Sequence, residues 1–141
     1  MRIDIITLFP EFFEGIKNHS IVGRAIGSGK IELYTHNLRD WSTDSYKTVD
    51  DHPYGGGSGM VLKIDVMVPA IRAVKEKNPG AKVILLTPQG EVYRQEMART
   101  FAKESGLILV AGHYEGFDER IREYVDMEIS AFTTRIPEIV S

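Results

Sequence analysis

Three glycine-containing segments carry most of the side chains in this sequence that are suited to ligand binding. They are Pro53-Tyr54-Gly55-Gly56-Gly57-Ser58-Gly59-Met60, Thr87-Pro88-Gln89-Gly90 and Gly112-His113-Tyr114-Glu115-Gly116. Tyr114 can pack on a heterocycle, and Glu115 can accept hydrogen bonds from an exocyclic amine or a ribose. A plain strand-to-helix turn also uses glycines for positive φ, and for residues 112–116 this interpretation stays open.

The glycine-rich segment from Gly55 to Gly59 does not match two common nucleotide-binding patterns. No Lys-Ser or Lys-Thr pair follows it, so it is not a phosphate-binding P-loop. Met60 stands where a dinucleotide fingerprint has its last glycine, and no strand directly precedes the segment. A flexible surface loop is the alternative, although the Pro53-Tyr54 lead and the position before a helix favour a function.

The remaining residues argue against metal and thiol chemistry. The chain has no cysteine, which excludes disulfides, thiolate catalysis and cysteine-ligated metals. The histidines at 19, 36, 52 and 113 show no paired ligand spacing, so a zinc site is not expected. Asp50 and Asp51 are more typical of a solvated turn than of a metal site. We therefore expect no metal.

Apolar patterning predicts the elements that position these segments. Apolar runs predict strands at residues 3–8, 82–86 and 107–111, and alternation predicts one at 31–36. Helical spacing predicts helices at 11–26, from a cap at Asp65 to about 77, at 91–105 and at 118–125, the last of which leads to residues 127–130. Near-continuous apolar strands are typical of parallel sheets. The predicted fold is α/β, an open and mostly parallel sheet with helices on both faces. Residues 87–90 and 112–116 should then line one crevice at the carboxyl ends of neighbouring strands.

Size and charge set the broad class. A chain of 141 residues with 43% hydrophobic content predicts one domain. With 17 basic and 20 acidic side chains, any RNA site must be a local patch. The first apolar run contains charges and soon reaches Pro10, so it is neither a secretory signal nor a membrane span. We expect a cytoplasmic protein that makes no membrane contact.

Four segments together resemble the bacterial tRNA (guanine-N1)-methyltransferases of the SPOUT superfamily. They are Asp4 to Phe12, the tract from Arg39-Asp40-Trp41-Ser42-Thr43-Asp44 through Thr48-Val49-Asp50-Asp51 to Met60, Leu86 to Gly90, and Gly112-His113-Tyr114-Glu115-Gly116-Phe117-Asp118-Glu119-Arg120. They occur in the family's order through most of the chain. Long strings in series make the resemblance highly specific.

The resemblance implies a homodimer with a C-terminal trefoil knot that holds S-adenosylmethionine bent in the crevice and methylates N1 of the guanosine 3′ to the tRNA anticodon. The cofactor-binding positions carry over to Leu86, Thr87, Pro88, Gln89, Gly112, Tyr114, Glu115 and Gly116. The segment beside the cofactor and the target base is Tyr54, Gly55, Gly56, Gly57, Ser58 and Gly59. Glu115 and Arg135 are the candidate catalytic residues.

The chain departs from the family after Ser130. The family continues with Ile-Gly-Asp-Tyr-Val-Leu-Thr-Gly-Gly-Glu, whereas this chain has Ala131 to Ser141. That tail resembles the helix that follows the family's cofactor loop, with one residue fewer between its Arg and Pro, so roughly 15–20 residues are missing before Arg135 on this interpretation. The family's helical tRNA-binding domain, which supplies a catalytic aspartate, is also missing.

Residues 1–141 are therefore expected to form the N-terminal cofactor-binding domain, which binds cofactor weakly or not at all and methylates little alone. An alternative is a non-catalytic binding module that retains the SPOUT fold. An unrelated nucleotide-binding α/β domain is disfavoured by the failed P-loop and dinucleotide patterns.

Overall fold

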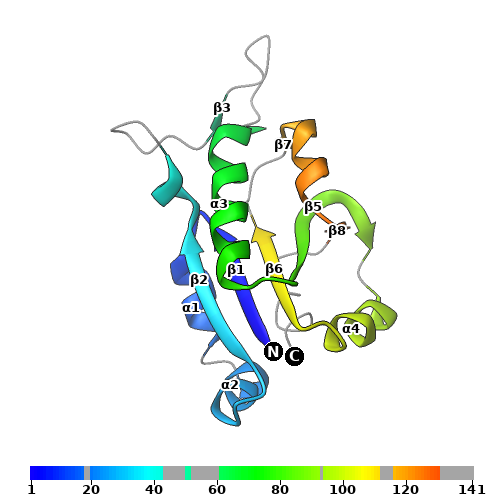
Figure 1. Cartoon of the computed structure of the whole chain (residues 1–141). Coiled ribbons are helices and arrows are strands. Elements are labelled where there is room, and N and C mark those ends of the chain that lie inside the picture. The colour runs from blue at the N-terminus through cyan, green and yellow to red at the C-terminus, as the bar shows by residue number, and fades with distance from the viewer. Residues whose placement is uncertain (18–19, 43–49, 52–60, 93, 112–115, 131–141) are drawn as a thin grey trace.

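A five-stranded, fully parallel sheet forms the centre of the protein. A computed structural model describes residues 1–17, 20–42, 50–51, 61–92, 94–111 and 116–130. The strand order in the sheet is β2-β1-β6-β5-β8 (Figure 1). The strands are β1 (Arg2–Thr7), β2 (Glu32–Asn37), β5 (Lys82–Val92), β6 (Gly106–Ala111) and β8 (Met127–Ser130). The predicted open, parallel α/β sheet is confirmed.

Helices cover both faces of this sheet, as the apolar strands predicted. On one face α1 (Pro10–Ile16) and α4 (Gln95–Ala102) contribute the buried rings of Phe13 and Phe101. The opposite face is covered by α3 (Ile64–Lys77) and by the 3-10 helices η1 (Leu38–Trp41) and η2 (Glu119–Tyr124).

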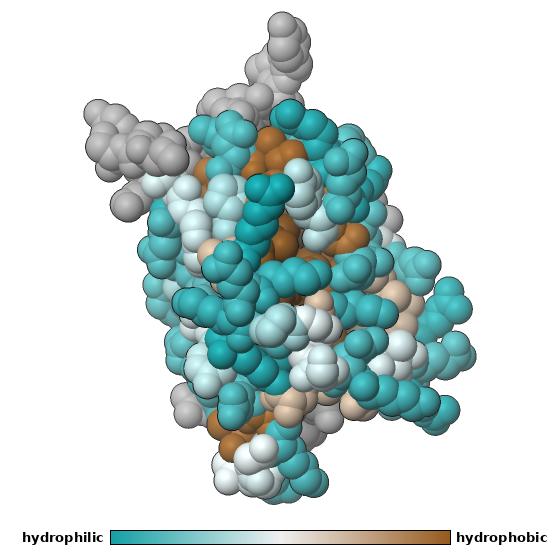
Figure 2. All heavy atoms as spheres, in the orientation of Figure 1, coloured by the Kyte–Doolittle hydropathy of each residue, from teal (hydrophilic) through white to brown (hydrophobic). Residues whose placement is uncertain are grey.

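Successive residues of the central strand β6 point to opposite cores. Leu107 and Leu109 belong to one core, and Ile108 and Val110 to the other. The face seen in Figure 2 carries the exposed side of α3, which is mainly hydrophilic, with Asp65, Arg72, Lys75, Glu76 and Lys77 exposed. Among the described residues no helix is long and apolar enough to cross a membrane.

A second, small sheet has the order β3-β4-β7. Its strands are β3 (Asp50–Asp51), β4 (Val61–Leu62) and β7 (Gly116–Phe117). β3 pairs antiparallel with β4, and β4 pairs parallel with β7. Sequence patterning did not predict this sheet, because two-residue strands carry no periodic signal.

The strand β5 is longer than predicted. It runs to Val92 instead of ending at Leu86, and the helix expected to begin at Glu91 begins at Gln95. The added residues Glu91 and Val92 pair with Ile129 and Ser130 of β8. Pairing with the edge of β8 thus keeps this stretch in β5, although its residue spacing favoured a helix, because long-range strand pairing overrides local preference.

Two helix predictions also need correction. The stretch predicted as one helix over residues 11–26 forms two, α1 and α2 (Ser20–Gly27), consistent with the poor helix propensity of Gly15 near the end of α1. Asp65 does not cap α3, which begins at Ile64 with Lys63 at the N-cap and no side-chain cap. Asp65 instead lies exposed in the first turn, where a carboxylate is favourable.

The last predicted helix agrees with the structure. η2 occupies the stretch predicted as a short helix, with Ile121 fully buried, and β8 follows it. No knot is visible in the part of the chain that the structure describes, and residues 131–141 lie outside that part.

Candidate functional site

The second and third candidate segments begin side by side at the carboxyl edge of the main sheet. Leu86 pairs with Ala111 in the last β5–β6 pair, so Thr87 and Gly112 follow directly from neighbouring strands. Leu86 is half-buried, and Thr87 is 5% exposed. Ligands of open α/β sheets bind at this edge. The predicted adjacency of these two strand ends is thus present.

The small sheet links the residue that follows the glycine-rich segment to the end of the third segment. Residues 52–60 connect β3 to β4, and Val61, which follows them, pairs with Gly116 at the end of the third segment. Leu62 pairs with Phe117 in the same register. The backbone therefore joins the ends of two segments that lie more than fifty residues apart in the sequence. Residue patterns alone did not predict this contact.

Many of the candidate residues themselves lie outside the described structure. These are Tyr54, Gly55, Gly56, Gly57, Ser58, Gly59, Gly112, Tyr114, Glu115 and Arg135. For Pro88, Gln89 and Gly116 the structure describes the backbone. Their ligand contacts therefore stay predictions.

The buried hydroxyl of Thr7, which the sequence analysis did not identify, stabilises a turn at this edge of the sheet. Thr7 is fully buried at the end of β1 and pairs with Ala111. Its Oγ1 accepts a hydrogen bond of 3.0 Å from the Phe9 amide, which turns the chain into α1. A threonine whose hydroxyl accepts from the amide two residues later is a common local turn signal, so this role was accessible to sequence reasoning.

Asp118, just after the third segment, is held by Arg120. Its Oδ1 accepts from the Arg120 amide and Nε, both at 3.0 Å, and Oδ2 accepts from Nη2 at 2.6 Å. The side-chain hydrogen bonds from Arg120, with the backbone one, lower the pKa of Asp118 to about 2. A carboxylate of such low pKa is a weak proton acceptor at neutral pH, so Asp118 is poorly suited to act as a general base.

An open cavity of about 430 Å³ lies beside β8. Its lining residues are Gly90, Glu91, Arg122, Val125, Asp126, Met127 and Glu128, of which Gly90 alone belongs to a candidate segment. Arg122 pairs with both Glu119 and Glu128. Among the described residues no cluster of three His, Asp or Glu side chains is arranged to hold a metal ion.

Comparison with known proteins decides the family. A family model described as "tRNA (Guanine-1)-methyltransferase TrmD" matches residues 1–132. The chain belongs to this family. Relatives named tRNA (guanine-N(1)-)-methyltransferase include one from Clostridium botulinum, 55% identical over 130 residues, and one from Chloroflexus aggregans, 55% identical over 132 residues. Each alignment covers 92% of this chain.

A solved TrmD-family structure has the same fold. The tRNA (m1G37) methyltransferase from Aquifex aeolicus superposes with a TM-score of 0.83 at 36% identity, over 94% of this chain and 60% of that one. The chain spans about half the length of the curated relatives it matches, since the alignments cover 53% and 52% of the Clostridium botulinum and Chloroflexus aggregans proteins. Membership of the TrmD family thus shows that this chain is related to one part of these proteins and has the fold of that part.

Proposed function

We propose that residues 1–141 are the cofactor-binding domain of an S-adenosylmethionine-dependent enzyme that methylates N1 of the guanosine 3′ to a tRNA anticodon. The observation that carries this proposal is the pairing of the residues that flank the candidate segments: Leu86 pairs with Ala111 in the main sheet, and Val61 pairs with Gly116 in the small sheet. These pairings join the ends of the candidate segments, which supports the proposal that the segments line one crevice, and family membership supports the reaction class.

The residues at this edge fit the proposed cofactor. Half-buried Leu86 and buried Ala111 offer an apolar floor, and the backbone of residues 87–89 offers donors and acceptors beyond it. Leu86, Thr87, Pro88 and Gln89 form one wall in this proposal, and Gly112, Tyr114, Glu115 and Gly116 form the other. Bound S-adenosylmethionine supplies an electrophilic methyl group on a sulfonium.

The protein then has two tasks, to align the guanine N1 with the methyl group and to accept the N1 proton. The segment from Tyr54 to Gly59 contacts the target base in this proposal. Glu115 orients it by accepting a hydrogen bond from an exocyclic amine. Arg135 contributes positive charge at the reacting centre. The proton acceptor comes from sequence beyond this domain, consistent with the low pKa of Asp118.

The proposed assembly is a cytoplasmic homodimer that binds tRNA. The relatives' additional length supports a further domain that contacts tRNA, because this chain accounts for 53% of the Clostridium botulinum protein. The near-balanced charge of this chain, 17 basic against 20 acidic side chains, is in line with RNA being bound mainly elsewhere.

A non-catalytic binding module is the second candidate function. The pairing of Asp118 with Arg120 and of Glu119 with Arg122 favours it, because these acidic side chains next to the third segment are already engaged in ion pairs. The two candidates differ in one measurable outcome. Both predict ligand binding at the crevice, but only the first predicts methyl transfer when this chain replaces the matching part of the full-length Clostridium botulinum relative.

We expect the 141-residue chain alone to transfer methyl groups at least on the order of 100-fold more slowly than the full-length Clostridium botulinum relative, because a positioned general base contributes about that factor or more. The assay measures transfer of a labelled methyl group from S-adenosylmethionine to a tRNA transcript. A transcript with adenosine at the target position is the control. Transfer by the chain at the relative's rate would contradict this prediction.

Weak cofactor binding by the chain itself is expected at millimolar S-adenosylmethionine. Amide resonances from residues 86, 87, 89, 90 and 111–117 should shift on titration, whereas those of α2 at the other end of the sheet should not. An absence of shifts at the crevice, with the fold intact, would count against the proposed cofactor walls.

A further inference from the structure

The strand β5 leaves β8 and returns to it at the same residue. Leu86 pairs with Ile129, and so does Glu91, so residues 87–90 form an excursion with no counterpart on β8. Figure 1 shows β5 arching at this point. The excursion is a large bulge, and bulges are common next to active sites, where they redirect the chain.

Gly90 closes the bulge by direct contact with the backbone of β8. A Cβ atom at this position would lie 2.5 Å from Ile129 N, 2.6 Å from the Glu128 carbonyl carbon and 2.7 Å from the Ile129 carbonyl carbon. Backbone atoms cannot rotate away as the end of a side chain can. A glycine within a strand often marks such a close approach of two backbones.

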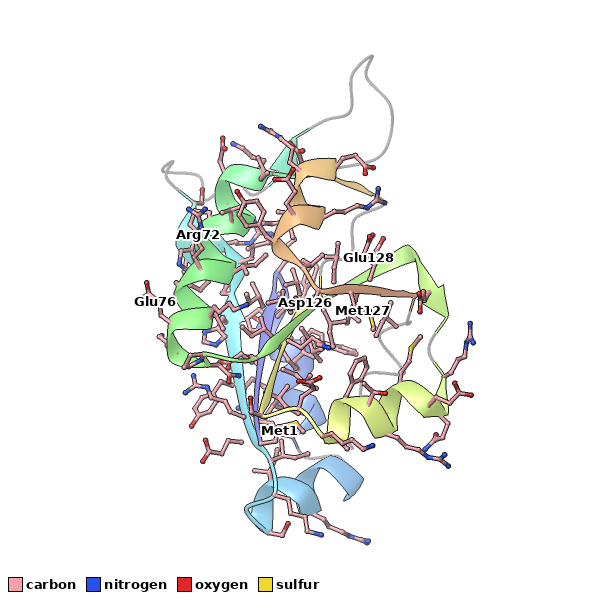
Figure 3. The ribbon with its side chains drawn as sticks, turned by 45° about the vertical axis from the view of Figure 1, so that its right-hand side comes forward. Met1, Arg72, Glu76, Asp126, Met127 and Glu128 are labelled. Atoms are coloured by element: carbon pink, nitrogen blue, oxygen red, sulfur yellow. The ribbon has the colours of Figure 1, made fainter. Side chains whose placement is uncertain are left out.

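β8 has little freedom to move aside, because the residue that precedes it, Asp126, is hydrogen-bonded to the start of β5. Asp126 Oδ2 accepts a hydrogen bond of 2.7 Å from the Val83 amide, and the Asp126 amide donates to the Val83 carbonyl at 2.8 Å. The Ile129 side chain is fully buried in the core. Figure 3 shows Asp126, Met127 and Glu128 along this strand beside β5.

We propose that Gly90 is a positioning residue: it locks the four-residue bulge onto β8 and thereby sets the backbone of residues 87–89 as the cofactor wall. Both ends of the bulge are held at Ile129, so a displacement at Gly90 is transmitted to the residues between them. The locking follows from the β5–β8 contacts alone. The consequence for S-adenosylmethionine rests on the proposed function.

The first test is hydrogen exchange of the Gly90→Ala variant. Amides of residues 84–92 and 127–130 should exchange on the order of tenfold faster than in the unsubstituted chain, while those of β1 and β2 keep their rates. Gly15→Ala is the matched control, because a Cβ at Gly15 meets no atom within 4 Å. Leu33→Ala, in the buried face of β2 at the opposite edge of the sheet, controls for general loss of stability.

The second test is the affinity for S-adenosylmethionine, measured by amide shifts with all variants folded. Gly90→Ala should weaken binding by roughly tenfold or more, whereas Gly15→Ala and Leu33→Ala should keep the affinity of the unsubstituted chain.

Unchanged exchange in Gly90→Ala, or acceleration spread over the whole sheet as in Leu33→Ala, would overturn the positioning role. Unchanged affinity despite locally faster exchange would also overturn it. If the unsubstituted chain shows no crevice shifts, the proposed function fails, and the exchange pattern still decides whether Gly90 locks the bulge.

Discussion

Replacing Asp4 with alanine is expected to lower the free energy of unfolding by about 3 kcal/mol, toward the lower end of the range for breaking a buried ion pair. Asp4 is fully buried in β1, yet its carboxylate contacts three side chains. Arg2 donates to it at 2.9 and 3.1 Å, Asn78 Nδ2 at 3.0 Å, and His36 Nε2 lies 2.7 Å away. Removing the carboxylate leaves all three without this partner.

The expected loss in the free energy of unfolding lies at the lower end of this range because two of the three partners of Asp4 reach solvent. The side chains of Arg2 and His36 are 28% and 13% exposed, so water can replace part of what they lose. Arg2 also stacks on Tyr34, with its guanidinium carbon 4.2 Å from the ring centre, and keeps that contact. Chemical denaturation at neutral pH measures the loss. Glu76→Ala on the exposed side of α3 is the control and should change stability little.

The same carboxylate predicts a pH dependence. Burial raises the pKa of Asp4, but hydrogen bonds from His36, Arg2 and Asn78 together outweigh it, so the pKa lies below its ordinary value. An acidic group with a lowered folded-state pKa stabilises the protein above its unfolded-state pKa, and that stability is lost as the pH falls through the folded-state value. His36 Nε2 must then carry the hydrogen, because the ionised carboxylate only accepts.

Unfolding curves of the unsubstituted chain and of Asp4→Asn, recorded from neutral pH down to pH 2, test this dependence. The difference in stability between them should be largest near neutrality and should shrink as the pH falls. A difference independent of pH down to pH 2 would show that the charge of Asp4 does not contribute.

Gly106→Ala is the second substitution with a large expected effect, about 2–3 kcal/mol of destabilisation from overpacking and a displaced buried amide. A Cβ at Gly106 would lie 2.9 Å from Asn78 Cγ and Nδ2, and closer still to Oδ1. Asn78 is 6% exposed and donates to the Arg2 carbonyl at 3.1 Å as well as to Asp4. Its amide cannot move without breaking these hydrogen bonds.

Thermal or chemical unfolding measures this loss, and Gly27→Ala is the control, because a Cβ at Gly27 meets no atom within 4 Å. The double variant Gly106→Ala/Asn78→Ala should lose less stability than the sum of the two single variants, since the steric conflict disappears with the amide. Strict additivity would contradict the proposed clash.

The sequence determined the main elements of the fold through local patterns. The apolar run from Leu107 to Ala111 predicted a strand buried on both faces, and its residues do alternate between two cores. The segment order that resembles the family was also readable directly, and the family match over residues 1–132 agrees with it. Such signals are local, so they need no knowledge of which strands pair.

The tertiary structure alone decided the contacts between distant residues. Asp4 was visible in the sequence only as a charge within an apolar run, and its partners His36 and Asn78 lie 32 and 74 residues away. The sequence predicted a loop at Gly90, whereas pairing of the next two residues with β8 extends β5 through this position. Pairing of Val61 with Gly116 joined two candidate segments that no periodicity relates. Residue spacing predicts which face of a strand is apolar, but the partners of a polar group or a glycine depend on the packed chain.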